Sequence, residues 1–379
     1  MKAKGNLLFF VTEDWYFAMH FLHFAAAAKL DGWDVCLFCN TGQKGEAAMM
    51  EIADAGIRVF PIKLSRTQLT PYADLKAFLK ILSFVKTWKP NVIHAVALKP
   101  IFFCDLISRI TATPVVAMMT GLGYVYTSSS LKAKLIRPLV TRLLKWAWHN
   151  QFARFMVLNP DDALWAQENM NISGDMVHVL PGIGIDTFRF YPGKPSGEFT
   201  VAFVGRMLRD KGLFELMQAM RLVREQGFNA RLLLIGAPDI SSPASVGIEQ
   251  ISAWQQEGLC DYLGHISDVA GMLRKVHALV LPSYREGMPT SILEAAATGL
   301  PCIATDVPGC RSAVINGETG ILVPPFNSEA IASAVIHLIQ NPDERKRMGK
   351  NAQKLVEERF SRSIVVKQMT QLYDSFSRA

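Results

Sequence analysis

Two segments in the second half of this sequence carry residues that could bind a phosphorylated sugar. In the first, Arg206 and Lys211 flank a turn between Gly205 and Gly212, directly after the apolar run 200–204. Fixed cations at such a turn can neutralise a diphosphate, and Gly212 lets the chain enter a helix whose first amides attract anions. A solvated basic loop is the alternative, but the glycines and the strand-to-helix position favour a phosphate site.

The second segment, 283–294, holds two glutamates at a strand-to-helix junction. It follows the apolar run 278–282, and Pro289 predicts the start of a helix that Gly299 ends. Glu286 then lies in the loop and Glu294 about one turn inside the helix. A nucleotide sugar needs such a series of contacts: carboxylate to sugar hydroxyls, amides to the diphosphate, carboxylate to the ribose. A surface helix with a capping acid is the alternative interpretation.

Parallel sheets must position these loops. Short apolar runs alternate with amphipathic segments of helix length, and several runs are apolar throughout, which is typical of strands covered on both faces. This alternation predicts a doubly wound α/β fold. The expected strands are 6–11, 33–39, 92–95, 115–118, 155–158, 177–180, 200–205, 230–235, 278–282, 301–305 and 320–323.

A segment rich in proline and glycine divides the chain near its middle. The segment 191–198 reads YPGKPSGE and has no periodicity, so we predict an interdomain linker there. The predicted domains are 1–190 and 199–355, followed by a C-terminal helical segment, 356–379. A length of 379 residues fits two domains that each bury a core.

Composition excludes several classes of protein. With 50% hydrophobic residues the chain cannot be largely disordered. Its six cysteines are too scattered for a disulfide scaffold, and Cys36 and Cys39 lie inside an apolar run, so a reduced, buried pair is expected. We find no signal peptide and no apolar stretch of the ~20 residues that a membrane span needs. A cytoplasmic location is expected, with at most peripheral attachment to a membrane.

The net charge of +7 lies mostly in the first half. Residues 1–190 contain 20 Lys/Arg and 14 Asp/Glu, an excess of +6, whereas residues 191–379 contain 20 and 19, an excess of +1. The first half is therefore expected to face an anionic partner.

The two segments together resemble a known family. Glu286 and Glu294 in the frame E-x7-E, with G-R-x4-K-G around Arg206 and Lys211, resemble the retaining glycosyltransferases of family 4. The segments 306–311 and 316–324 match the two segments that normally follow the E-x7-E frame in this family. The opening segment 11–20 and the segment 120–124 resemble a bacterial branch that builds surface polysaccharides. This resemblance implies the GT-B fold: two Rossmann-like domains facing a cleft, with the C-terminal helix crossing back to the first domain.

The resemblance also implies roles for individual residues. Arg206 and Lys211 would hold the diphosphate, Glu286 the transferred sugar and Glu294 the ribose, with Glu286, Arg206, Lys211 and His20 as the catalytic set. The base pocket is expected near Gly236 and 264–266. The complete donor-binding prediction is Gly205, Arg206, Lys211, Gly236, Ile266, Glu286, Gly287, Met288, Pro289, Thr290, Ser291 and Glu294. No metal or other cofactor is expected, because fixed cations would replace the metal.

On the acceptor side the sequence departs from the family. Many relatives carry a histidine after the fourth strand, where this chain has Met119, Thr120 and Gly121. His20 and His94 are the remaining histidine candidates, although His94 could equally be a core residue. Glu13 and Asp14 follow the first predicted strand. Either could serve as a catalytic base, or could be present because the first turn of a helix favours acids. The predicted acceptor-side residues are Glu13, Asp14, His94, Thr120 and Gly121.

Residues 131–155 have the composition of a membrane-surface helix. Apolar residues recur at helical spacing, six cations are interspersed, and no acid occurs from 131 to 154. Two tryptophans, Trp146 and Trp148, add interfacial aromatics. A helix covering the core is the alternative. Nucleic acid is the rival polyanion, but no nucleic-acid motif is evident.

Together with these features, the resemblance implies a retaining glycosyltransferase that moves a sugar, expected to be UDP-linked, to a polyisoprenyl-diphosphate-linked glycan on the inner face of the cell membrane. The expected product belongs to surface polysaccharide, such as O-antigen, capsule or exopolysaccharide. The alternatives are a transferase that acts on a small soluble acceptor, an epimerase of the same fold, and a non-catalytic nucleotide-sugar-binding protein.

Overall fold

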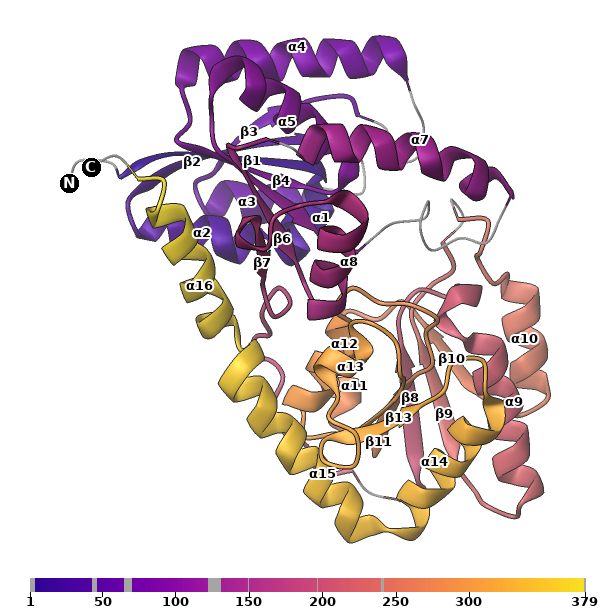
Figure 1. Ribbon diagram of the computed structural model, residues 1–379. Coiled ribbons are helices and arrows are strands. Elements are labelled where there is room, and N and C mark those ends of the chain that lie inside the picture. The colour runs from indigo at the N-terminus through magenta and orange to yellow at the C-terminus, as the bar shows by residue number, and fades with distance from the viewer. Residues whose placement is uncertain are drawn as a thin grey trace. The chain divides into compact units, whose positions relative to one another are not determined.

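The chain forms two compact units, each with its own sheet (Figure 1). The computed structural model describes residues 4–42, 46–64, 70–121, 131–148, 150–195, 197–239 and 242–377. The first unit comprises Met1–Ile183 and Val365–Ala379, and the second comprises Gly184–Ile364. The division into units does not test the linker at 191–198 or the domain boundaries expected from the sequence, and both stay predictions.

The first unit is built on a seven-stranded sheet in the order β3-β2-β1-β4-β5-β6-β7, with every pairing parallel. The central strand β1 is buried on both faces, which explains its continuous apolar run. The strands are β1 (Gly5–Glu13), β2 (Trp33–Asn40), β3 (Arg58–Pro61), β4 (Val92–Val96), β5 (Val115–Met119), β6 (Ala153–Val157) and β7 (Val177–Val179).

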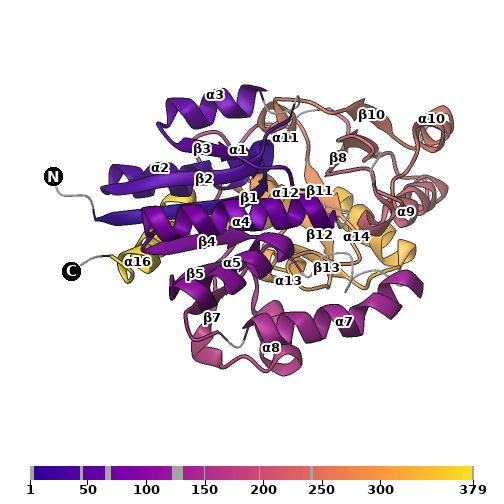
Figure 2. The same cartoon turned by 90° about the horizontal axis from the view of Figure 1, so that it is seen from above.

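Helices cover both faces of this sheet. Side chains of α4, α5, α7 and α8 join the even-numbered residues Leu8 and Phe10 of β1 in one core cluster. Figure 2 shows α4 lying over the sheet on this side. The helices of the first unit are α1 (Asp14–His20), α2 (Leu22–Leu30), α3 (Glu46–Asp54), α4 (Pro71–Trp88), α5 (Leu98–Thr111), α7 (Leu131–Trp148), α8 (Pro160–Met170) and most of α16 (Arg362–Asp374).

The C-terminal helix α16 packs on the first unit. Tyr373 is completely buried, and its ring lies 6.4 Å from that of Trp33 and 5.9 Å from that of His94. Asp374 pairs with Lys4 at 3.1 Å. These contacts confirm the prediction that the last helix returns to the first domain.

The second unit repeats the architecture with a six-stranded parallel sheet in the order β10-β9-β8-β11-β12-β13. Its strands are β8 (Thr200–Val204), β9 (Arg231–Ile235), β10 (Asp261–Gly264), β11 (Ala278–Leu281), β12 (Cys302–Thr305) and β13 (Gly320–Val323). Its helices are α9 (Leu213–Glu225), α10 (Ile248–Gln256), α11 (Val269–Leu273), α12 (Thr290–Ala297), α13 (Cys310–Ala313), α14 (Ser328–Gln340) and α15 (Pro342–Leu355), and a π-helical turn, Val356–Phe360, follows.

The predicted α/β class with two parallel sheets is therefore confirmed, with two local corrections. The edge strands β3 and β10 were not predicted, because neither is a continuous buried apolar run. The single helix predicted over 131–155 is wrong at its end: α7 stops at Trp148, and Ala153–Val157 is strand β6. Arg154 therefore belongs to the sheet and donates to Ala153 O at 3.1 Å.

No helix among the described residues is long and apolar enough to cross a membrane. In the same part of the chain, no three His, Cys, Asp or Glu side chains gather as metal ligands. Cys36 and Cys39 are buried free cysteines on β2.

Candidate active site

An ion pair joins the two predicted donor-site loops of the second unit. Lys211 Nζ donates to Glu286 Oε1. Lys211 ends a 3₁₀ turn after β8, and Glu286 lies in the loop after β11, the strand that pairs with β8. Their side chains are only 19% and 11% exposed, so the pair is largely shielded from water, which strengthens the attraction. A cation and a carboxylate thus meet at the carboxyl edge of the sheet, where ligands bind in this architecture.

Hydrogen bonds and close backbone packing hold these two loops in place. Tyr284 N donates to Asp210 O at 2.9 Å, and the Tyr284 hydroxyl donates to the carboxylate of Glu215 at 2.9 Å. Gly212 has a φ of +72°, and a Cβ there would lie 2.1 Å from Pro282 O. Only glycine tolerates this conformation and this close approach. These contacts therefore fix the positions of the two loops that carry Lys211 and Glu286.

Arg206 pairs with Asp239, a residue that was not expected at this site from the sequence. Its guanidinium lies 2.7 Å from Asp239 Oδ2, in the loop after β9, and 54% of its side chain is exposed. The strands β8 and β9 converge here, because a Cβ on Gly236 would lie 1.8 Å from Gly205 O. Arg206 is therefore near the sheet edge and accessible, but Asp239 rather than Glu286 neutralises it.

Glu294 lies in a shielded position on α12. Burial raises the pKa of its carboxyl to about 7, and the nearby Arg189 opposes this shift. The helix α12 begins at Thr290 after the extended Pro289, as the sequence predicted. A Cβ on Gly309 would lie 2.6 Å from Gly287 O, so a neighbouring loop fixes the approach to the helix.

The remaining residues predicted on this loop lie around the start of α12. Met288 and Pro289 are buried, and Thr290 and Ser291 are half-buried. Ser283, directly after β11, is fully buried, and within the described part of the chain its Oγ has no hydrogen-bond partner.

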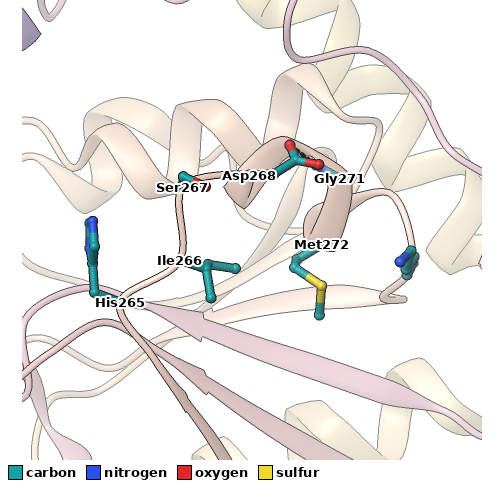
Figure 3. Close-up of a pocket in the computed structure, with 7 residues that line it drawn as sticks. His265, Ile266, Ser267, Asp268, Gly271 and Met272 are labelled. Atoms are coloured by element: carbon teal, nitrogen blue, oxygen red, sulfur yellow. Dashed lines mark hydrogen bonds between the residues drawn. The ribbon is translucent and has the colours of Figure 1, made fainter.

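A pocket of about 360 Å³ lies beside the predicted base site (Figure 3). Ile266 and Met272 form its apolar side, and Asp268 caps the short helix α11 by accepting from Gly271 N at 2.8 Å. Gly236 N donates to Gly264 O at 2.8 Å, so two of the predicted base-site segments adjoin. The residues that line the pocket are His265, Ile266, Ser267, Asp268, Gly271, Met272 and Lys275.

In the first unit, a tyrosine contacts both Thr120, a predicted acceptor-side residue, and His20, a predicted catalytic residue. The Tyr16 hydroxyl donates to Thr120 Oγ1 at 3.3 Å, and its ring lies 4.6 Å from that of His20. Burial lowers the pKa of His20 to about 4, so the imidazole is neutral at pH 7. The sequence did not single out Tyr16, although it lies one helix turn before His20. Gly121 follows Thr120 at the end of the described segment.

The two acids of the first loop have backbone and amide partners. Asp14 is 1% exposed and accepts from Trp15 N at 2.7 Å and from Gly42 N at 3.3 Å. Glu13 Oε2 accepts from the side-chain amide of Asn40 at 3.4 Å. Asp14 is the first residue of α1, a position where the helix dipole favours an acid. A role of Glu13 or Asp14 as a base stays a prediction.

His94 lies inside the core, not at the surface of the first unit. It is the third of five residues of β4 and is 0% exposed. Its Nδ1 lies 2.6 Å from the Tyr373 hydroxyl, and in the described residues Nε2 has no partner. Burial lowers the pKa of His94 to about 3. Of the two predicted roles for His94, this environment favours the core role, because an enclosed imidazole cannot reach an acceptor.

The helix α7 shows two kinds of surface in its described residues. Leu144 is buried and Val140 packs against the core, whereas Leu135, Leu143 and Trp146 are 78%, 43% and 51% exposed. The side chains of Lys132, Lys134 and Trp148, also predicted for the membrane surface, lie outside the described residues. The helix therefore combines the core role with an exposed apolar surface.

Both halves of the chain match families of glycosyltransferases. Residues 184–355 match the family described as "Glycosyl transferases group 1", and residues 6–151 match "Glycosyl transferase 4-like". The matched ranges contain the Lys211–Glu286 pair and the Tyr16–Thr120 contact, respectively.

Three similar proteins illustrate the relationship. The N,N'-diacetylbacillosaminyl-diphospho-undecaprenol alpha-1,3-N-acetylgalactosaminyltransferase of Campylobacter jejuni is 26% identical, over 86% of this chain and 87% of its own. The capsular polysaccharide biosynthesis glycosyltransferase CapM of Staphylococcus aureus is 25% identical over 90% of each chain. Anabaena HepE, solved in complex with UDP and glucose, is 18% identical, with a TM-score of 0.79 over 98% of this chain and 100% of its own. The likeness to HepE shows a common fold.

Proposed function

The chain belongs to the group 1 glycosyltransferases of family 4, which have the GT-B fold, and on this premise we propose that it is a retaining transferase acting on a nucleoside-diphosphate sugar. The observation that carries this proposal is the shielded Lys211–Glu286 pair at the carboxyl ends of β8 and β11, with Arg206 and Glu294 on the flanking elements. Donors of this kind present a diphosphate, sugar hydroxyls and ribose hydroxyls, and these residues offer a partner for each.

We assign the roles as follows. Lys211 and Arg206 stabilise the negative charge that develops on the departing phosphate. Glu286 accepts hydrogen bonds from the transferred sugar, and Glu294 accepts them from the ribose. The bond from the anomeric carbon to the phosphate oxygen breaks while the acceptor oxygen attacks from the same face, and the acceptor proton passes to the leaving phosphate. On the acceptor side, neutral His20 can form a hydrogen bond with the acceptor sugar.

We further propose UDP as the nucleotide and a polyisoprenyl-diphosphate-linked glycan as the acceptor. The names of the two curated relatives support this choice, since one acts on an undecaprenol-linked sugar and the other belongs to capsule synthesis. HepE was solved with UDP. The product would be a surface polysaccharide.

The membrane contact proposed for α7 accounts for access to such an acceptor. Exposed Leu143 and Trp146 lie on the same helix as exposed Arg142 and Lys145. Cations of this kind are attracted to the anionic cytoplasmic leaflet, where nucleotide sugars are available. We therefore propose that the protein acts at the inner face of the cell membrane.

A donor panel tests the enzymatic proposal. Purified protein is incubated with UDP-, GDP- and TDP-sugars, with and without a short-chain polyprenyl-diphosphate sugar, and released nucleoside diphosphate is measured. We expect release that depends on one UDP-sugar and on the acceptor. Release without any acceptor glycan, or conversion of the donor to an epimer, would contradict the transferase proposal. Turnover of a water-soluble glycoside alone would replace the lipid-linked acceptor by a small soluble one.

A further inference from the structure

The outward face of α4 carries large apolar side chains in water. Tyr72, Leu75 and Leu79 are 83%, 57% and 53% exposed. Their spacing of three and four residues puts them on one face of the helix. Scattered single apolar residues are ordinary on protein surfaces, but three aligned on one helix face indicate contact with something apolar.

The charges on this face have one sign. Lys76, Lys80 and Lys86 are exposed between and beyond the apolar residues. The only acid of α4, Asp74, is 8% exposed and turned to other partners: it pairs with Lys99 Nζ at 2.8 Å and accepts from Thr70 N at 3.1 Å. The outward face therefore combines apolar side chains with cations and presents no acid.

Core packing fixes which face of α4 points outward. Ala77, Ile81 and Val85 are buried in the core cluster of the first unit, so the helix cannot turn without exposing them. Phe78 packs edge-to-face on Phe103 of α5, with ring centroids 5.8 Å apart. The apolar and basic face is thus a fixed part of the fold.

The helix α4 lies on the same side of the sheet as α7. Both contribute to one core cluster, with α5 packed against each of them (Figure 2). On α5, Arg109 donates to Trp146 O of α7 at 2.7 Å, and its guanidinium lies 4.7 Å from the Trp146 ring centroid. The exposed residues of α4 and α7 therefore belong to one side of the first unit.

We propose that α4 is a second lipid-contacting helix, so that the first unit rests on an anionic bilayer through α4 and α7 together. The apolar residues would enter the boundary between headgroups and acyl chains while the lysines meet anionic headgroups. Charge argues against a second copy of the chain as the occupant, because a symmetric contact through this face would oppose like charges. The inference rests on the proposed membrane contact and extends it to α4.

Vesicle co-sedimentation tests the inference. Phosphatidylcholine vesicles with and without phosphatidylglycerol are mixed with the full chain and with Lys76→Gln/Lys80→Gln. We expect about tenfold weaker binding of this variant to the anionic vesicles. The matched control is Lys346→Gln/Lys350→Gln, two exposed lysines with the same spacing on α15 of the second unit, and it should bind like wild type. Leu75→Gln/Leu79→Gln should lower the part of the binding that persists at high salt.

The outcomes separate this inference from the proposals beneath it. If both α4 variants bind like wild type while Arg142→Gln/Lys145→Gln binds more weakly, α7 alone contacts lipid and the inference is overturned. If wild type binds no anionic vesicle at low salt, both membrane contacts are wrong. Transfer to a short-chain soluble acceptor analogue, measured in parallel, reports the transferase activity independently, and thermal unfolding checks that each variant folds.

Discussion

Lys211 and Glu286 neutralise each other where neither is well solvated. Removing Lys211 leaves the Glu286 carboxylate poorly compensated and removes a cation from the diphosphate. Because a hydrogen bond to a charged group contributes about 1.5–3 kcal/mol, we expect Lys211→Ala to lower kcat/KM by roughly ten- to a hundredfold. The measurement is steady-state release of nucleoside diphosphate.

A double-mutant cycle sharpens this test. Since the two residues contact each other, Lys211→Ala/Glu286→Gln should lose less than the product of the two single losses. Lys350→Ala, a change of an exposed lysine on α15, should leave kcat/KM within twofold of wild type. Multiplicative losses in the cycle would show that the pair does not act as a unit.

Glu294 provides a prediction about pH. Its folded-state pKa of about 7 lies above the ordinary value of 4.5, so the folded chain binds an extra proton between these pH values. The free energy of unfolding should therefore fall as pH rises through this window, by up to about 3 kcal/mol. Glu294→Gln should flatten this dependence and weaken binding of the nucleoside diphosphate.

Urea unfolding across the same pH range measures the first effect, and calorimetric titration with UDP measures the second. Glu225→Gln, at an exposed glutamate of α9, is the control and should change neither. An unchanged UDP affinity in Glu294→Gln would remove Glu294 from the ribose site.

Among the elements of the second unit, the 3₁₀ turn Arg209–Lys211 is held in position because Gly212, directly after it, packs against Pro282 at the end of β11. Gly212→Ala combines an unfavourable positive φ with a clash against Pro282 O. Gly227→Ala is a matched control, because its φ is +79° and no atom lies within 4 Å of the new Cβ.

We expect the control to lower the free energy of unfolding by about 1 kcal/mol and Gly212→Ala by about 2–4 kcal/mol, with activity lost in Gly212→Ala alone. Chemical denaturation and turnover are the measurements. Equal destabilisation of the two variants would mean that the contact with Pro282 does not hold the turn.

At the scale of the whole molecule, α16 returns to the first unit and closes its core over His94. Tyr373→Phe removes the hydroxyl that pairs with His94 Nδ1 and leaves this nitrogen unpaired in the interior. We expect a loss of about 1–3 kcal/mol of unfolding free energy. Tyr191→Phe, at an exposed tyrosine, is the control and should change little.

The same site predicts how stability depends on acid. The folded-state pKa of His94, about 3, lies below the ordinary 6.5, so the unfolded chain binds the extra proton between these values. The stability linked to His94 is complete above pH 6.5 and declines as pH falls towards 3. A His94→Gln variant, followed by denaturation over this range, should lose part of this decline; an unchanged pH profile would contradict the assignment.

The α/β class, the parallel strands and the two loops that carry Arg206, Lys211, Glu286 and Glu294 were predictable from the sequence alone. This was possible because strands buried on both faces need continuous apolar runs, and because loops after such strands reach one edge of a sheet. The edge strands β3 and β10 escaped prediction, since half-exposed strands need no such run.

Which side chains meet depends on how the chain folds in three dimensions. Asp239 reaches Arg206 from the loop after another strand, and Tyr16 of α1 donates to Thr120, which lies 104 residues further along the chain. The enclosure of His94 depends on a tyrosine 279 residues away. The outward face of α4 is likewise set by packing, because its apolar residues occur all round the helix and the core selects which of them are buried.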